Sequence, residues 1–271
     1  MLDKEAEHWD KVAKGWFQKS YANELLAEHK RNTCLRLISG WADVAHSQMI
    51  LKTDLFAEAF GPEQFLFNLT TPNSIVAIDV SKEIVTQAKG QAQQYSVDSS
   101  KYLCCDVKHL PFCSNSFDLI ISDSTLDHFP SETDIITALK ELGRVLQAGG
   151  TLILTIDNKG NLTYPPFMFF RLWMKLKLAP YFIGRTLSRT KLQQVLNESG
   201  LDVAECTAIF HYPHPDGLVR WLERSIRRLG RGRFDNAIRR GLTLLDKLET
   251  KRSKYLTGRY IALKAVKRGT S

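Results

Sequence analysis

The sequence lacks any run of about 18 apolar residues, so no segment is expected to span a membrane. Its first residues, MLDKEAEHWDKVAKGWF, are charged and amphipathic and have no apolar centre of the kind found in signal peptides. Internal repeats and low-complexity tracts are also absent. A chain of 271 residues with this character is expected to fold as one large domain, or one domain with an insertion, in the cytoplasm.

Cysteine is scarce as well. The chain has five cysteines, at positions 34, 104, 105, 113 and 206. Their number is odd and their spacing matches no set of metal ligands, so neither a disulfide framework nor a cysteine-based metal site is expected. Reduced thiols in the cytoplasm are the favoured interpretation.

Positive charge is abundant but unevenly placed. The net charge is +8, and residues 218–254 hold twelve Lys and Arg against four acids, which is the whole surplus. Apolar residues in this segment recur at helical spacing on both sides of Gly230-Arg231-Gly232, which favours two amphipathic helices. One interpretation is an inserted helical hairpin with a solvated arginine face. The other is a surface for an anionic membrane or an acidic partner, with nucleic acid least favoured because no binding module is recognisable.

Two acidic residues follow short apolar runs in the first half of the chain. Residues 74–78 form a β-branched run that ends on Asp79, and Ser81 then stands in the N-cap position of a helical pattern. Residues 102–106 repeat the arrangement and end on Asp106. Ligands of open α/β sheets bind at the carboxyl ends of the strands, where an acid can accept both hydroxyls of a ribose. The pair therefore predicts a nucleoside pocket.

The remaining pattern alternates strands with helices. Strands are expected at 48–52, 74–78, 102–106, 117–122, 151–156, 201–211 and 257–267, with helices over 1–46, after Ser81, at 131–146 and at 188–200. The last two strands read as an antiparallel pair. This predicts an α/β fold with a mostly parallel sheet and an antiparallel edge. Residues 1–46 would form an N-terminal helical unit, and residues 47–271 an α/β domain with the basic helical insertion at 212–256.

Two aromatic segments have open roles. The N-terminal helix carries Trp9, Trp16 and Phe17, and it could either pack on the sheet or form a lid over a pocket. Residues 164–185 interleave Phe, Trp, Met and Leu with Arg and Lys. They could form a core-facing helix, an apolar lid over a lipophilic substrate, or a helix that faces a membrane.

Three stretches resemble a known family: VAIDVSKEIVTQAK, YLCCDVKHLPFCSNSFDLIISDSTLDHF and ALKELGRVLQAGGTLILTIDN. They are similar to class I S-adenosylmethionine-dependent methyltransferases, of the broad type that includes small-molecule and quinone methyltransferases. The resemblance covers about residues 48–204 and the closing strand. It implies a Rossmann-like methyltransferase sheet and S-adenosyl-L-methionine as cofactor.

The resemblance also implies roles for particular residues. The cofactor-binding residues would be Asp54, Asp79, Val80, Asp106, Val107, Ser122 and Asp123. Asp79 would accept the ribose hydroxyls, and Asp106 would accept the adenine amino group. Asp127 and His128 would face the transferred methyl group, with His128 as general base because an imidazole titrates near neutral pH. The alternative for His128 is a strand-end histidine that bonds to backbone.

The chain departs from this family at the turn after the first strand. Members usually carry Asp/Glu-x-Gly-x-Gly-x-Gly there, and glycines let the backbone approach the cofactor. The turn here reads Lys52-Thr53-Asp54-Leu55-Phe56-Ala57-Glu58, so Asp54, Phe56 and Glu58 fill the three glycine positions. Asp54 or Glu58 could pair with the ammonium or sulfonium of the cofactor. The acidic turn could instead hold a metal or a substrate amine.

Three functions remain open at this point. The favoured one is a methyltransferase, without a metal, that acts on a small apolar or aromatic acceptor and works in the cytoplasm or peripherally at the membrane. The second is an enzyme that keeps the nucleoside pocket but performs other chemistry. The third is a non-catalytic relative whose basic arm binds a partner.

Overall fold

The computed structural model describes residues 2–16, 24–69, 74–95, 100–164, 184–212, 225 and 234–269. The strands are β1 (Met49–Thr53), β2 (Ser74–Asp79), β3 (Ser100–Cys104), β4 (Phe117–Asp123), β5 (Leu146–Asp157), β6 (Leu201–Ile209) and β7 (Tyr260–Lys267). They form one seven-stranded sheet in the order β3-β2-β1-β4-β5-β7-β6. β7 runs antiparallel to both of its neighbours, and the other pairs are parallel. The predicted Rossmann-like sheet with an antiparallel last strand is confirmed.

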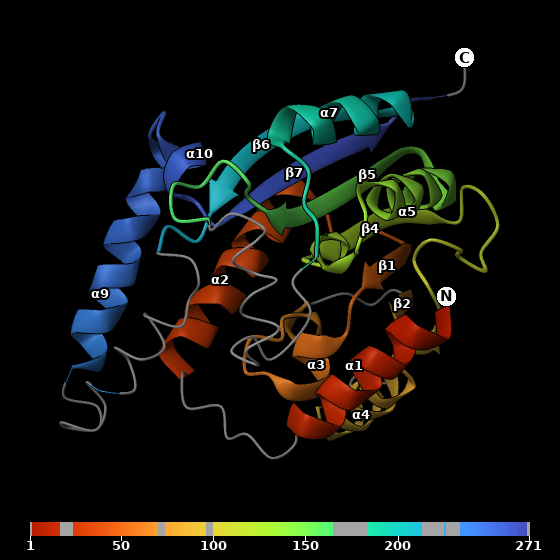
Figure 1. Cartoon of the computed structure of the whole chain (residues 1–271), viewed down its shortest axis with the longest axis horizontal. Coiled ribbons are helices and arrows are strands. Elements are labelled where there is room, and N and C mark those ends of the chain that lie inside the picture. Colours follow the sequence, from red (N-terminus) through yellow and green to blue (C-terminus); the bar gives the residue numbers. More distant parts are fainter. Residues whose placement is uncertain are drawn as a thin grey trace.

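Helices cover both faces of this sheet (Figure 1). The α-helices are α1 (Leu2–Trp16), α2 (Glu24–Trp41), α3 (Phe56–Phe60), α4 (Lys82–Gln94), α5 (Glu132–Val145), α7 (Arg189–Glu198), α9 (Asp235–Asp246) and α10 (Lys254–Thr257). Short 3-10 helices are η1 (Leu66–Asn68), η2 (Leu126–His128) and η3 (Lys247–Thr250). α5 and α7 pack on one face, while α1 to α4 and α9 contribute to the core on the other. Leu51 and Ile50 face these two cores in turn, as the strand period of two requires.

Serine side chains fix where three helices begin. Ser81, Ser131 and Ser188 each accept a hydrogen bond from the backbone N–H three residues further on. Such a cap satisfies one of the N–H groups that the first turn of a helix leaves without a partner. All three starts were predicted from the sequence and are confirmed.

Several predicted strand ends were wrong. β3 ends at Cys104, so Asp106 lies in the following turn, two residues beyond the strand. β5 begins at Leu146, five residues before the predicted start, because Leu146 pairs with Phe117 and the register then shifts past Gly149. Gly149 has φ of 76°, a conformation that glycine adopts at low cost. β7 begins only at Tyr260 because the residues before it form α10.

Several predictions concern residues outside the described parts. These include Phe17, nearly all of the aromatic segment 164–185, and the first half of the basic segment. The second half forms α9, η3 and α10, which lead directly into β7. Figure 1 shows α9 beside α2 at one end of the sheet. No helix in the described parts is long and apolar enough to cross a membrane.

Candidate functional site

Asp79 ends β2 and lies almost buried at the ligand edge of the sheet. Its Oδ1 accepts from Ser81 N at 2.8 Å, and its Oδ2 accepts from Leu55 N at 3.0 Å. Burial raises the pKa of Asp79 to about 6, against the lowering effect of these two hydrogen bonds. The orientation of the carboxylate is therefore fixed by backbone N–H groups in the turns that follow β1 and β2. The predicted position at the carboxyl end of a parallel strand is confirmed.

Asp106 lies in the turn after the neighbouring strand β3. Its Oδ1 accepts from Lys108 N at 2.9 Å, while its Oδ2 is buried and has no hydrogen bond. Lys108 Nζ stands 3.5 Å from this oxygen. Buried carboxylate oxygens are rarely left without a donor, so a donor from a ligand suits this position. Val107 is buried beside it, in the core cluster that α5 covers.

These two acids and their surroundings fit an adenosine. The Oδ2 of Asp106, which has no hydrogen bond, matches the amino group of adenine, and the Asp79 carboxylate matches the two ribose hydroxyls. Val80 follows Asp79 directly and is half-buried. The residues present therefore fit the nucleoside part of S-adenosylmethionine.

The turn after β1 has an unusual backbone. Asp54 has φ of 68°, in the left-handed region that glycine usually occupies. Asp54 Oδ1 accepts from Phe56 N at 2.8 Å, which supports the turn. Burial raises the pKa of Asp54 well above its usual range, and the nearby Asp79 raises it further. The chain thus keeps the backbone of the first glycine but adds a carboxyl group beside Asp79.

The other acid of the turn points elsewhere. Glu58 is buried in α3, and its Oε2 lies 3.1 Å from the Nζ of the equally buried Lys52. Glu58 Oε1 accepts from Leu66 N at 3.3 Å. The expectation that Glu58 could pair with the cofactor was therefore wrong, since its charge is already matched inside the fold. In the described parts of the chain, no three His, Cys, Asp or Glu side chains gather as metal ligands.

The end of β4 carries Ser122 and Asp123. Ser122 is fully buried, and its Oγ accepts from Thr53 Oγ1 at 2.9 Å, so its hydroxyl bridges β4 to β1. Asp123 accepts from Thr155 Oγ1 at 2.5 Å, and burial raises its pKa. Both residues lie beside the turn at Asp54, since β4 pairs with β1. Their predicted contact with the cofactor is untested.

Asp127 and His128 follow in η2 and have different surroundings. Asp127 is buried and accepts from Ser124 Oγ at 2.9 Å and from Asp157 N at 3.2 Å. It therefore links the loop after β4 to the end of β5. The His128 side chain is 22 % exposed, with Nε2 4.0 Å from Asp127 Oδ1. Of the two residues, His128 has the freer access to a ligand.

Helix α1 lies at this edge and contacts His128 and residues next to Asp79 and Asp106. Glu5 pairs with Lys108 at 3.0 Å, and Trp9 packs edge-on against His128. Asp10 accepts from Ser81 Oγ and from Glu83 N at the start of α4. The lid over a pocket, expected from Trp9, Trp16 and Phe17 as one alternative, stays a prediction, and the sequence interpretation gave no role to the two acids Glu5 and Asp10. Their only signal was that they lie about one turn apart beside Trp9.

Further polar groups near the site come from the far end of the chain. Tyr260, the first residue of β7, accepts from Ser124 Oγ at 3.4 Å and is half-buried. The Arg259 guanidinium lies 5.2 Å from its ring centroid. Burial, together with Asp157 and Asp127, raises the pKa of Tyr164 above its usual range. Arg259 and Tyr260 were not predicted as site residues, because only the antiparallel course of β7 brings its first residue to this edge.

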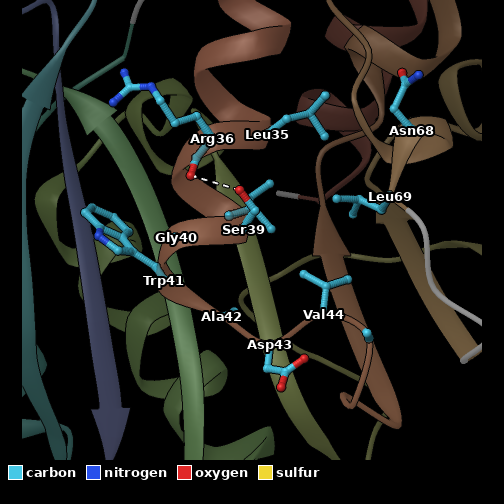
Figure 2. A pocket seen from close by; sticks show the side chains of 12 residues that line it. Leu35, Arg36, Ser39, Gly40, Trp41, Ala42, Asp43, Val44, Asn68 and Leu69 are labelled. Atoms are coloured by element: carbon cyan, nitrogen blue, oxygen red, sulfur yellow. Dashed lines mark hydrogen bonds between the residues drawn. The ribbon is translucent and has the colours of Figure 1, made fainter.

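A separate cavity of about 800 Å³ lies at the opposite edge of the sheet (Figure 2). The end of α2 and residues 41–45 line it, together with Asn68 and Leu69. None of the predicted site residues contributes to it. Residues 41–45 precede β1 and Asp54 follows it, so the cavity and the predicted site are at the two ends of the same strand.

Comparisons with known proteins agree with this geometry. Residues 59–154 match a family model described as a methyltransferase domain. The chain is 32% identical over 79 residues to the uncharacterized methyltransferase YcgJ of Bacillus subtilis, which covers 29% of this chain and 30% of that protein. It is 28% identical over 153 residues to a demethylmenaquinone methyltransferase of Staphylococcus aureus, 56% of each chain. The chain spans about a third of the length of the first curated relatives that it matches.

Solved structures show the same fold. The [4+2]-cyclase SpnF superposes with a TM-score of 0.59 at 19% identity, over 88% of this chain and 81% of that one. A putative sarcosine dimethylglycine methyltransferase from Galdieria sulphuraria superposes with a TM-score of 0.57 at 16% identity, over 88% and 85% of the two chains.

Proposed function

Because residues 59–154 match a family model described as a methyltransferase domain, we propose that this protein transfers a methyl group from S-adenosyl-L-methionine to a small acceptor. One observation carries the proposal. Asp79 and Asp106 follow neighbouring parallel strands, and the buried Oδ2 of Asp106 has no hydrogen bond in the described structure. The Asp79 carboxylate can accept hydrogen bonds from the two ribose hydroxyls, and Asp106 Oδ2 can accept one from the adenine amino group.

The chain's own residues would divide the work. When bound, the cofactor supplies a methyl group on a sulfonium. Asp79 and Asp106 orient the nucleoside, and the Asp54 carboxyl group can pair with the ammonium of the methionine part. His128 would take a proton from the acceptor, with Asp127 as the buried neighbour that holds η2 against β5. Helix α1 excludes water from the reacting groups, and orientation then supplies much of the rate.

The acceptor that suits this surface is apolar or aromatic. The ring of Trp9 contacts His128, and the rings of Trp9 and Trp16 both contact Phe56, with centroids 6.1 Å apart for Trp9 and Phe56 and 5.2 Å apart for Trp16 and Phe56. Such rings bind flat apolar molecules by stacking and area burial. A relative named for demethylmenaquinone supports the same class of acceptor. Because the turn carries Lys52 and Glu58 in place of an acid and a glycine, other chemistry in the same pocket is the second candidate.

Calorimetric titration with S-adenosylmethionine and S-adenosylhomocysteine tests the cofactor. We expect micromolar binding that Asp79→Ala weakens strongly. A folded protein that binds neither molecule would exclude the methyltransferase function. A screen of radiolabelled methyl transfer to quinols, phenols and aliphatic amines then identifies the acceptor, and the second candidate gains if the cofactor binds but no methyl group is transferred.

The second half of the basic segment supports a site of action at an anionic membrane. Three ion pairs tie α9 and η3 to α2: Arg239 with Glu28, Asp246 with His29, and Glu249 with Arg36. Two of the three acids in residues 234–256 therefore face the protein. Arg240, Leu244, Leu245 and Lys247 remain exposed on the outside. Exposed leucines beside cations are typical of helices that lie in a bilayer interface.

Vesicle sedimentation tests this surface. Leu244→Asp with Leu245→Asp, and separately Arg240→Glu with Lys247→Glu, should each reduce binding to phosphatidylglycerol vesicles by about tenfold or more. The matched control is Leu103→Asp with Lys101→Glu on β3, an exposed pair at the other edge of the sheet. Equal loss in the control, or none in the α9 variants, would refute the membrane surface.

A further inference from the structure

Lys52 and Glu58 stand where the family that the chain resembles carries an acid and a glycine. Both are charged, yet their side chains are 2 % and 0 % exposed. Buried charges are costly unless they are paired and hydrogen-bonded. Their presence at the one turn where the chain departs from its family therefore calls for a local role.

The contacts of Lys52 define that role. Its Nζ lies 3.1 Å from Glu58 Oε2 and 5.0 Å from the centroid of the Phe65 ring, and it donates to the carbonyl oxygen of Asp54. The N–H group of the same peptide unit, on Leu55, donates a hydrogen bond to Asp79 Oδ2 at 3.0 Å. One peptide group is thus held from both sides, by Lys52 at its oxygen and by Asp79 at its nitrogen.

The charges around Lys52 keep it ionised. Burial lowers its pKa, but Glu58, Asp54 and Asp123 outweigh this effect and raise the pKa overall. An ionised Lys52 remains a strong donor to the Asp54 carbonyl. Glu58 is held in turn by Leu66 N, which ties the ammonium to η1. The peptide between Asp54 and Leu55 therefore has a fixed orientation, although Asp54 has the positive φ that glycine would adopt more readily.

We propose that Lys52 and Glu58 are a positioning pair for cofactor binding: they clamp the peptide between Asp54 and Leu55 and so aim the carboxylate of Asp79 at the ribose. The pair takes over the task that glycines perform in the resembled family, which is to shape the turn. This inference rests on the proposed function, because the ligand of Asp79 is the ribose of the cofactor.

The test uses a double variant, since either single change would leave a buried charge without its partner. Lys52→Met with Glu58→Met removes the clamp but keeps apolar volume. We expect a melting temperature within a few degrees of wild type and a loss of S-adenosylhomocysteine affinity of tenfold or more by calorimetry. The matched control is Lys30→Met with Glu63→Met, a pair 3.2 Å apart between α2 and the loop after α3, which should leave the affinity unchanged.

A cycle with Asp79→Ala separates a positioning role from a merely structural one. If the pair acts through Asp79, the affinity lost by Asp79→Ala should shrink severalfold in the Lys52→Met, Glu58→Met background. The inference would be overturned if Asp79→Ala lowered the affinity by the same factor in both backgrounds. It would also be overturned if the Lys52→Met, Glu58→Met variant bound with wild-type affinity. If the wild-type protein binds no cofactor, the proposed function fails instead. Calorimetry of the wild-type protein therefore comes before that of any variant.

Discussion

The indole ring of Trp9 lies edge-on against the imidazole ring of His128, with 4.9 Å between their centroids. The contact joins α1, the first helix of the chain, to η2, which follows the fourth strand of the sheet. It places an aromatic side chain directly over the candidate general base. The same helix also reaches Asp106 through the ion pair of Glu5 with Lys108. In the proposed pocket, α1 would therefore restrict access to the end at His128 and to the end at Asp106.

Trp9→Ala should speed ligand release. Edge-on ring contacts contribute about 0.5–1.5 kcal/mol each, so loss of those with His128 and Phe56 predicts a dissociation rate of S-adenosylhomocysteine several times higher. Stopped-flow fluorescence measures this rate. Trp41→Ala, at the distant cavity of Figure 2, serves as the control and should leave it unchanged. An unchanged rate in Trp9→Ala would show that α1 is not a lid.

Cofactor affinity should depend on pH through Asp79. Its pKa is about 6 in the free protein, and only the ionised carboxylate accepts both ribose hydroxyls. Below that pKa, affinity should fall by roughly tenfold per pH unit, so binding at pH 5 should be about ten times weaker than at pH 7. Calorimetry across this range is the measurement. A flat profile would show that Asp79 does not bind the cofactor as an ionised group.

Stability of the free protein should show the opposite trend. Because the folded pKa of Asp79 is raised, its contribution to the free energy of unfolding is fully present below the unfolded pKa of about 4 and is lost as pH rises through about 6. The loss is at most about 3 kcal/mol for a shift of roughly two units. Asp79→Asn should flatten this part of the stability curve in urea titrations at pH 4, 5, 6 and 7. Wild type and variant curves of equal slope would contradict the assignment.

Asp106→Asn should change the base that the pocket accepts. An asparagine amide can present a donor where the carboxylate presented only acceptors, so adenine would lose its partner. We expect S-adenosylhomocysteine to bind roughly ten- to a hundredfold more weakly. S-inosylhomocysteine, which carries an oxygen in place of the amino group, should gain affinity relative to wild type. Calorimetric titrations with both ligands measure these changes in affinity. An equal loss of affinity for the two ligands would show that Asp106 does not contact the purine base.

His211→Ala should destabilise the approach to β7. The ring is buried, with Nδ1 2.8 Å from Thr257 Oγ1 and Nε2 3.0 Å from the carbonyl oxygen of Ala208. Removal of both hydrogen bonds should cost about 1–3 kcal/mol in the free energy of unfolding. Burial lowers the pKa of His211, so wild type should also lose stability as pH falls below about 6.5, and the variant should not. Chemical denaturation at pH 5.5 and 7.5 measures both effects.

The sequence was sufficient for the parts of the fold that depend on short-range chemistry. The apolar run that ends at Asp79 and the serine at position 81 predict a strand and a helix start because each signal lies within a few residues. The boundary at Gly149 was wrong for the same reason. Two adjacent glycines favour a turn locally, but pairing of Leu146 with Phe117 draws them into β5.

In the candidate site, the sequence could predict only residues whose position follows from the local pattern. Asp79 and Asp106 could be found because each follows a strand. Lys52 reads as a surface lysine within a strand, and its burial becomes evident only when α3 folds back to bring Glu58 against it. Asp10 and Tyr260 were missed since their partners lie 71 and 136 residues away in the sequence.

The reversed direction of β7 makes its beginning, rather than its end, part of the ligand edge, where Tyr260 pairs with Asp157. Only Gly258 and Arg259 separate it from α10. These two residues are tightly packed. A Cβ atom added to Gly258 would stand 2.7 Å from the Cβ atom of Ala208, and Arg259 N donates to the carbonyl oxygen of Ile209. A displacement of α10 would therefore also displace Tyr260 and the Ser124 hydroxyl that donates to it, so this helix and the candidate site are mechanically coupled.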